Sequence, residues 1–522
     1  MADRAVTLGA GVLAAALLAL LLGPLAALGL SLEDLALTGP ELSALRFTVW
    51  QAFLSALISV ALAVPVARAL ARRQFVGRGA LISLLGAPFI LPVIVAVLGL
   101  LAVFGRVGWL NTGLGALGLP TMSVYGLQGV VLAHVFFNMP LAVRMILLGW
   151  QAIPAERFRL AASLGFHPAD IARHIERPML REVLPGVALV IFVISLTSFA
   201  VALTLGGGPR ATTLELAIYQ ALRFEFDLPT AARLALLQFA LCALAYAASA
   251  RINLPSGFGA GVDRAGGPPA PGGWRKGADF CAIILATTFL LLPLLAVALA
   301  GLPGMSTLPE TIWAAALRSL SVALGSTLLA MAAALLLALA AARSSARRRT
   351  APRGTGWPAL AATLPLAASS LVLGTGLFIL VQPFFRPSSL ALPITLAVNA
   401  TLALPFAFRI LAPEARRLHQ DYSRLSASLG MTAGARLRWV ILPRLARPLG
   451  FAAGLVAALS MGDLGVIALF AGAEQATLPL LVQRLMGAYR MQTAASAALL
   501  LVGLSFALFW IFDTLGKRHA AS

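Results

Sequence analysis

Residues 156–165 read Glu-Arg-Phe-Arg-Leu-Ala-Ala-Ser-Leu-Gly, and residues 421–430 read Asp-Tyr-Ser-Arg-Leu-Ser-Ala-Ser-Leu-Gly. The two stretches align without a gap, and the agreement continues to Pro178 in the first and to Pro443 in the second. A chance match that keeps both a Gly and a Pro in register over this length is improbable. We therefore interpret the chain as an internal duplication.

Each copy predicts a helix, a glycine turn and a second short helix. The segment before Gly165 is rich in Ala, Leu and Arg, which favour helices. Gly at the end of a helix adopts the left-handed conformation without a steric cost. Residues 167–177 have apolar side chains at helical spacing, and Pro178 follows near the start of an apolar run, where a missing N–H costs least. The alternative is an ordinary basic loop between two spans, and the recurrence of the pattern argues against it.

The composition is that of a membrane protein. Hydrophobic residues make up 60% of the chain and charged residues only 11%, whereas soluble domains average about 25% charged residues. The net charge of +20 lies in short segments between apolar runs of about 20 residues, the length that spans a bilayer. This distribution excludes a nucleic-acid-binding protein and marks the basic loops as cytoplasmic. Cys242 and Cys281 lie in or beside apolar runs and are interpreted as packing residues.

Apolar runs in two sets of six are expected to cross the membrane. They are residues 5–30, 47–66, 80–104, 127–150, 183–205 and 231–250, then 280–302, 317–341, 357–381, 389–411, 449–471 and 493–512. Pro88 and Pro92 lie inside the third run and predict a kink. The even number puts both termini and every strongly basic loop on the side of the two duplicated stretches, which the positive-inside rule makes cytoplasmic.

A Gly- and Pro-rich segment at residues 254–277 separates the two sets and predicts a flexible cytoplasmic linker. Residues 1–253 are then the first half, with its duplicated stretch at 153–178. Residues 278–522 are the second half, with its stretch at 418–443.

The chain offers no energy source of its own. Its two lysines, Lys276 and Lys517, are not part of G-x-x-x-x-G-K-[ST], so no phosphate-binding loop is present. Ion-coupled transport usually needs acidic or His residues within spans, and Asp463 and His134 are the candidates. Two such residues are few for a proton relay. The sequence therefore favours a permease driven by separate ATPase subunits. We expect no catalytic residue, no metal ligand and no cofactor.

The Ala-rich run, the Gly and the later Pro resemble the EAA loop of ABC-importer permeases. The resemblance implies an all-α polytopic fold of the type I importer class, with about twelve helices in two homologous halves, whose loops dock on an ATPase. At the position of the family's signature Glu, this chain has Arg159 and Arg424. The residues that carry the resemblance are Glu156, Arg159, Ala162, Gly165 and Pro178, and Asp421, Arg424, Ala427, Gly430 and Pro443.

Residues 46–60, 125–140 and 205–222 resemble the permeases of thiamine ABC transporters, and residues 462–470 do so more loosely. The resemblance implies uptake of thiamine, and of its phosphate esters, across a bacterial inner membrane. The implied partners are two copies of a cytoplasmic ATPase, a periplasmic thiamine-binding protein and the lipid bilayer. Ferric-iron importer permeases are the closest alternative. An ion-coupled secondary transporter and a membrane scaffold are the others.

Polar residues occur at one depth in both halves. Ser195 and Ser198 lie at the repeat positions of Ser460 and Asp463, which predicts a shared lining, although Ser and Thr also join helices. Asp463 either faces the pathway and attracts a cation, or caps a broken helix, or pairs with an Arg. His134 is interpreted as a hydrogen-bonded packing residue, and a short helix on the outer face is expected at residues 212–222.

Overall fold

The computed structural model describes residues 2–32, 34, 36–86, 88, 90–206, 208, 211–250, 272–347, 356–472 and 474–521. Within these ranges the chain is helical or irregular and contains no strand, which confirms the all-α class. Among the described residues, eleven helices are long and apolar enough to cross a membrane, and the number is twelve if Trp357–Ala367 and Ser370–Val381, a pair bent by 91°, are counted as one span. The predicted linker lies mostly outside the described residues, and α13 already begins at Trp274.

The helices of the first half include six longer ones, α1 (Ala2–Leu30), α2 (Gly39–Arg72), α4 (Val93–Phe104), α6 (Leu127–Gln151), α9 (Arg177–Leu196) and α12 (Leu228–Ala250). The shorter ones are α3 (Arg78–Leu84), α5 (Trp109–Ala116), α7 (Ala155–Ser163), α8 (Pro168–Ile171), α10 (Phe199–Leu205) and α11 (Leu214–Gln220).

The second half repeats this order. Its longer helices are α13 (Trp274–Gly301), α14 (Glu310–Arg347), α16 (Ser370–Val381), α17 (Ala391–Ser428), α19 (Leu442–Met461) and α22 (Met491–Ala521). The shorter ones are α15 (Trp357–Thr363), α18 (Ala433–Arg436), α20 (Gly465–Phe470) and α21 (Leu478–Gly487).

The third span is broken in both halves. In the first half α3 ends before Pro88 and α4 begins after Pro92, so the predicted kink is a complete break. In the second half we expected one continuous run over residues 357–381, and this is wrong. The chain turns at Ala368, and Ser369 starts a new helix by accepting a hydrogen bond from the N–H of Val372 at 3.1 Å. The side-chain cap satisfies a backbone group that the break leaves free.

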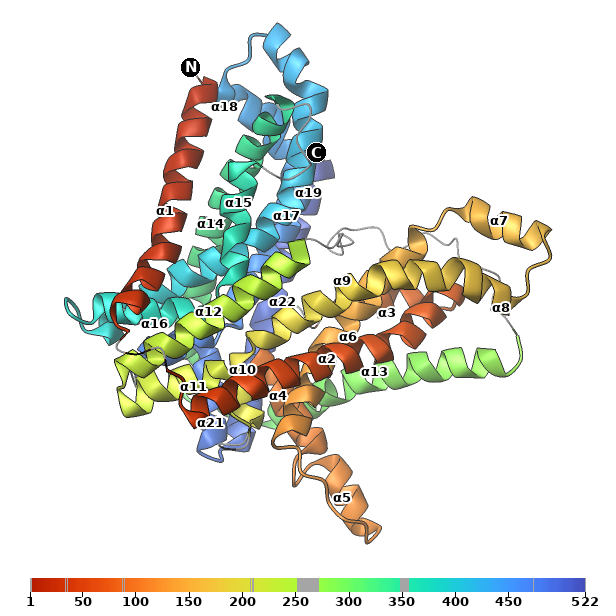
Figure 1. Ribbon diagram of the computed structural model, residues 1–522, viewed down its shortest axis with the longest axis vertical. Helices are drawn as coiled ribbons and strands as arrows, with labels where there is room; N and C mark the ends of the chain where they lie inside the picture. The colour runs from red at the N-terminus through yellow and green to blue at the C-terminus, as the bar shows by residue number, and fades with distance from the viewer. Residues whose placement is uncertain are drawn as a thin grey trace.

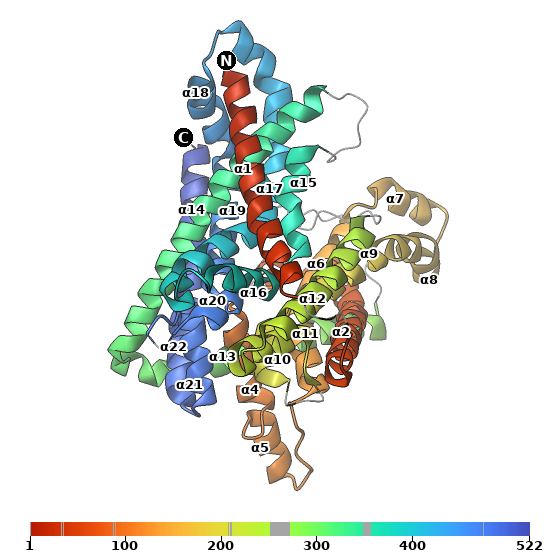
Figure 2. The same cartoon turned by 60° about the vertical axis from the view of Figure 1, so that its left-hand side comes forward.

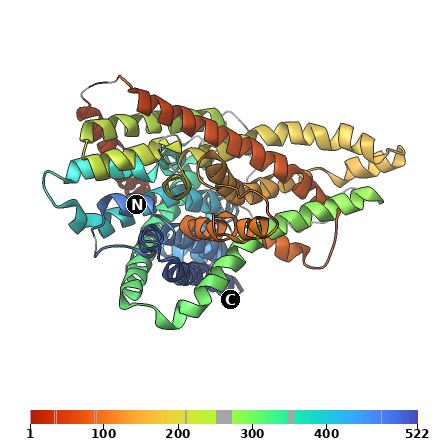
Figure 3. The same ribbon diagram turned by 90° about the horizontal axis from the view of Figure 1, so that it is seen from below.

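The two halves exchange their first helices. α1 packs on α14, α15 and α16 of the second half, and α13 packs on α2 and α4 of the first. Figures 1 and 2 show α1 lying along the second-half helices. Figure 3 shows α2, α9 and α13 extending together toward the end where α7 and α8 lie. Each half of the sequence is therefore completed by a helix from the other.

Two glycines bring the exchanged helices into backbone contact. A Cβ atom on Gly99 of α4 would lie 2.5 Å from the carbonyl oxygen of Pro293 in α13. A Cβ atom on Gly376 of α16 would lie 2.5 Å from the carbonyl oxygen of Pro24 in α1. The two contacts occupy equivalent places in the halves, and only a residue without a side chain fits them. Small residues allow this close approach of helices in membranes.

We predict that Gly99→Val and Gly376→Val each destabilise the fold, by about 1–3 kcal/mol or more, because the added side chain forces backbone apart. Gly503→Val in α22 is the control, since nothing lies within 4 Å of its Cβ position. Yield of monodisperse protein in detergent and SDS-induced unfolding measure the effect. Equal behaviour of all three variants would contradict the importance of the contacts.

The two duplicated segments lie at the ends of separate arms. In Figure 1, α7 and α8 end one arm, α18 ends the other, and α10, α11 and α21 lie where the arms meet. α1 begins and α22 ends on the α18 side.

Candidate coupling and pathway sites

The first duplicated segment has the predicted helix–Gly–helix shape. α7 ends before Gly165, whose φ is +69°. The N–H of Phe166 donates to the carbonyl of Ala161 at 2.9 Å, which closes the turn. α8 follows, and its start is capped by Asp170, which accepts from the N–H of His167 at 3.0 Å. A π-turn over Ala172–Glu176 leads into α9.

The second segment has the same turn but a different approach. Gly430 has φ +60°, and the N–H of Met431 donates to the carbonyl of Ser426 at 3.0 Å. Here α17 runs without interruption from its membrane span through residue 428, although we placed the start of the segment at 418. In the first copy the chain breaks before α7 because Pro154 lacks an N–H. The second copy has no proline at that position.

Every residue that carries the resemblance in these segments is exposed. The exposed set is Glu156, Arg159, Ala162, Gly165 and Pro178 in the first copy, and Asp421, Arg424, Ala427, Gly430 and Pro443 in the second. Leu160 and Leu164, which are 61% and 63% exposed, stand one helical turn apart, and Leu425 and Leu429 repeat them. Each segment thus presents two apolar side chains beside charged ones.

The Arg at the signature position has a partner within the chain in the first copy. Arg159 Nη2 lies 2.7 Å from Glu156 Oε1. A hydrogen bond from its own backbone N–H, followed by the charge of Arg159, holds the pKa of the Glu156 carboxyl below its usual value. Both side chains are more than 70% exposed, so the pair adds little stability and leaves both groups accessible.

A buried ion-pair cluster ties the first segment to α2, and sequence reasoning missed it. Glu176 is 2% exposed and lies 2.6 Å from Arg72 Nη2 and 2.9 Å from Arg68 Nη2. The second copy has Ile441 at the same repeat position. The run of arginines at the end of α2 signalled the cytoplasmic side, but its acidic partner lies 104 residues away in sequence.

The fifth span is broken in both halves at the polar positions that we singled out. α9 ends at Leu196 and α10 begins at Phe199, while α19 ends at Met461 and α20 begins at Gly465. Ser195 accepts a hydrogen bond from Asn138 at 3.1 Å, and Ser460 accepts one from Asn399 at 3.1 Å. Both serines therefore join the fifth span to the fourth.

Asp463 and Ser198 lie within these two breaks. Asp463 directly precedes Leu464, after which α20 begins, and the proposal that it caps this helix stays a prediction. Its Oδ2 atom is buried without a hydrogen-bond partner, and among the described residues no Arg pairs with it. Ser198 is half-buried and makes no side-chain cap.

His134 is a packing residue, as we interpreted it. It is 3% exposed, and its Nδ1 atom lies 3.0 Å from Ser55 Oγ in α2.

The short helix expected at residues 212–222 is present as α11, but it does not lie on the surface. Leu214 and Ile218 are fully buried. The interior position is possible because Thr48 of α2 accepts a hydrogen bond from the N–H of Leu214 at 2.8 Å. Ser319 does the same for Leu478 at 2.7 Å, at the start of α21. A hydroxyl from a neighbouring helix thus satisfies a helix end that would otherwise need water.

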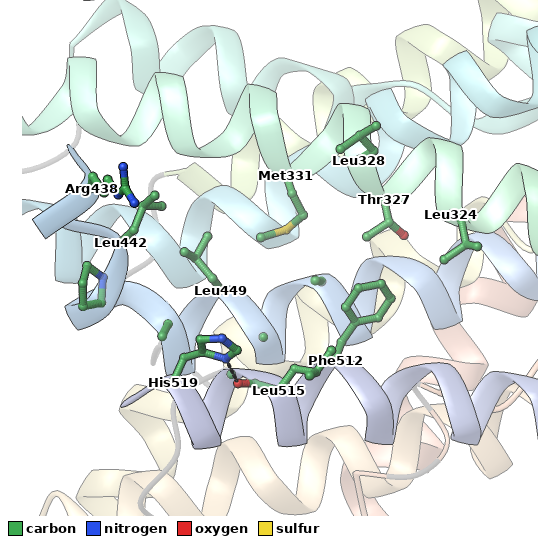
Figure 4. Close-up of a pocket in the computed structure, with 15 residues that line it drawn as sticks. Leu324, Thr327, Leu328, Met331, Arg438, Leu442, Leu449, Phe512, Leu515 and His519 are labelled. Carbon is green, nitrogen blue, oxygen red and sulfur yellow. Dashed lines mark hydrogen bonds between the residues drawn. The ribbon is translucent and has the colours of Figure 1, made fainter. Parts of the chain in front are cut away.

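A groove of about 740 Å³ opens between α14, α19 and α22 (Figure 4). Its lining is mostly aliphatic, and Arg438 and His519 lie toward one end. It contains none of the pathway candidates, although it touches Pro443 of the second duplicated segment. The basic groups make it a poor site for a cation.

Comparison with known proteins gives close relatives over most of the chain. The thiamine transport system permease protein ThiP of Escherichia coli strain K12 is 41% identical over 479 residues, 91% of this chain and 89% of the relative. ThiP of Haemophilus influenzae is 35% identical over 90% of this chain and 89% of its own length.

A shorter relative covers part of the chain. The molybdenum transport system permease protein ModB of Mycobacterium bovis is 32% identical over 39% of this chain and 76% of its own length. No family model matches. The identity and coverage of the longer relatives show that this chain is a multi-pass membrane protein of the family of thiamine transport system permease proteins.

Proposed function

We propose that this chain is the permease subunit of an ATP-driven importer that moves thiamine, and its phosphate esters, from the periplasm to the cytoplasm. The observation that carries the proposal is the close similarity over about nine-tenths of the chain to proteins named as thiamine transport permeases. The two exposed helix–Gly–helix segments support ATP hydrolysis as the energy source, because they offer docking surfaces for a separate ATPase.

Two copies of a cytoplasmic ATPase dock on the chain, one on each duplicated segment. The repeated leucine pairs, Leu160 with Leu164 and Leu425 with Leu429, provide apolar contacts. The charged groups around them provide pairing that is specific to each copy. ATP-driven closure of the ATPase pair then draws the two arms together, so that the pathway between the halves opens to the other side.

The membrane orientation follows from the same segments. The arginines at the end of α2 lie beside the first segment through Glu176, and α1 begins and α22 ends on the side of the second. Basic loops mark the cytoplasmic face. Both termini are therefore cytoplasmic in an inner membrane, residues 1–253 and 278–522 serve as two permease halves, and one chain suffices for each transporter. A periplasmic thiamine-binding protein delivers the substrate to the opposite face.

Uptake of labelled thiamine into proteoliposomes tests the proposal. The vesicles hold this chain with its ATPase, and the thiamine-binding protein and ATP are supplied on opposite sides. Uptake that requires both ATP and the binding protein is the expected result. ATP hydrolysis without thiamine flux would point instead to another substrate, ferric iron being the first to try. Flux that follows a proton gradient and ignores ATP would overturn the importer.

A further inference from the structure

Glu215 of α11 is fully buried. It lies beside the break in the fifth span of the first half. Its Oε1 atom accepts a hydrogen bond from Gln238 Nε2 at 3.3 Å, and the same amide donates to the carbonyl of Leu196 at 2.9 Å. Leu196 is the last residue of α9. The Ser369 hydroxyl also interacts with the carboxyl group. The second oxygen, Oε2, is buried and has no partner.

Asp463 lies at the break in the other fifth span, and the start of α16 connects the two acids. Ser369 interacts with Glu215, and its neighbour Ser370 lies against Gly465, where a Cβ atom would meet the Ser370 hydroxyl at 2.0 Å. α16 contacts both α11, which carries Glu215, and α20, which follows Asp463. Each acid has one buried oxygen free, Oε2 of Glu215 and Oδ2 of Asp463.

The absence of a basic partner distinguishes this pair from the other buried acids of the described chain. Glu41 lies 2.6 Å from Arg233, and Glu176 is held by Arg68 and Arg72. No ion pair forms at Glu215 or Asp463 within the described ranges. A carboxylate buried in this way is costly unless it binds a proton or a cation accompanies it.

Helix ends of both signs meet at the two breaks. The carbonyl groups at the end of α9 carry the negative end of a helix dipole toward one break, whereas Glu215 and Asp463 stand at the positive starts of α11 and α20. Membrane transporters use such interrupted helices, together with their free carbonyl groups, to hold cations near the middle of the bilayer. Here an acid lies beside the interruption in each half, Glu215 through Gln238 at the end of α9, and Asp463 just before α20.

We propose that Glu215 and Asp463 form the cation-binding pair of the translocation pathway, and that they receive the positively charged thiazolium ring of the substrate. The inference rests on the proposed function, since thiamine is an organic cation. Glu215 is then a specificity-determining residue, contributed by the first half, and Asp463 is its counterpart in the second. The partner-free oxygens, Oε2 of Glu215 and Oδ2 of Asp463, are the ones left for the ring, while Gln238 holds the other oxygen of Glu215.

Charge and shape are separated by paired substitutions at each acid. Glu215→Gln keeps the shape and the hydrogen-bond acceptor but removes the charge, whereas Glu215→Asp keeps the charge. Asp463→Asn and Asp463→Glu form the second pair. Glu225→Gln is the control, because Glu225 is exposed and follows α11 in the same segment. Initial rates of thiamine uptake are measured in proteoliposomes with saturating thiamine-loaded binding protein.

We expect Glu215→Gln and Asp463→Asn to lower the uptake rate about tenfold, with the charge-retaining variants falling less and the control unchanged. ATP hydrolysis stimulated by the binding protein should persist. The melting temperature of Glu215→Gln should equal or exceed that of the wild type, because an unpaired buried carboxyl is removed. Better uptake by the Gln variant than by the Asp variant, or a lower melting temperature, would assign Glu215 a structural role and overturn the inference. Failure of the wild type to move thiamine would instead refute the proposed function.

Discussion

Replacing Glu176 with Gln should lower the free energy of unfolding by about 3–5 kcal/mol, the cost of removing one partner from a buried ion pair. The carboxylate is 2% exposed and compensates Arg72, whose side chain is 5% exposed, together with Arg68. Without it, two guanidinium groups face each other at the inner end of α2. SDS titration of the purified permease measures the change.

Two further variants make this result specific. Glu182→Gln in α9 is the matched control, because Glu182 is exposed. The free energy of unfolding of this variant should equal that of the wild type. A double variant, Glu176→Gln with Arg72→Met, should recover part of the loss, since the unpaired charge is gone. Unchanged stability of Glu176→Gln would show that water reaches the arginines and that the cluster does not hold the first segment in place.

Substituting Gly165 or Gly430 with Val should reduce thiamine uptake more than tenfold while the ATPase continues to hydrolyse ATP. Each glycine has a positive φ, +69° and +60°, and a β-branched residue in that conformation costs about 1–2 kcal/mol. No atom lies within 4 Å of either Cβ position, so the strain is in the backbone alone. The turn should open and misplace the helix that docks on the ATPase.

Gly434→Val provides the control for this experiment. Gly434 lies in α18 of the same segment, it does not have a positive φ, and its Cβ position is also free of contacts. Uptake and ATP hydrolysis are measured on the same proteoliposomes, so that their ratio reports coupling. Normal uptake in both glycine variants would refute the coupling role of the turns.

Features that depend on short stretches could be predicted from the sequence. The spans were found because a bilayer requires about 20 consecutive apolar residues. The turns at Gly165 and Gly430 were found because few residues other than Gly readily end a helix in the left-handed conformation. The break at Pro88 and Pro92 has an equally local cause. The break before Ser369 could not be predicted, because serine also occurs within many helices and so does not mark a helix start by itself.

Features that depend on distant contacts could not be predicted. The burial of Glu215 in α11 depends on Thr48 of α2 and on Gln238 of α12. Nothing near Glu215 in the sequence indicates these neighbours. Asp463 can be recognised as a candidate because it lies inside an apolar run, whereas Glu215 lies between two runs. The assignment of the coupling residues and of the pathway serines stays a prediction.

The exchange of first helices has a consequence for the order in which the protein is made. Leu21 and Leu28 of α1 are buried in apolar clusters that contain residues of both halves, including Leu371 and Val372 of α16. At about 5–20 residues per second, synthesis reaches α16 on the order of 15–70 s after α1 is complete. During that time α1 can pack on α12 of its own half but not yet on α16, so its final docking joins segments that are far apart in the sequence. Fusion of the halves then keeps both exchanged helices at a high effective concentration, so that neither needs to find its partner by diffusion in the membrane.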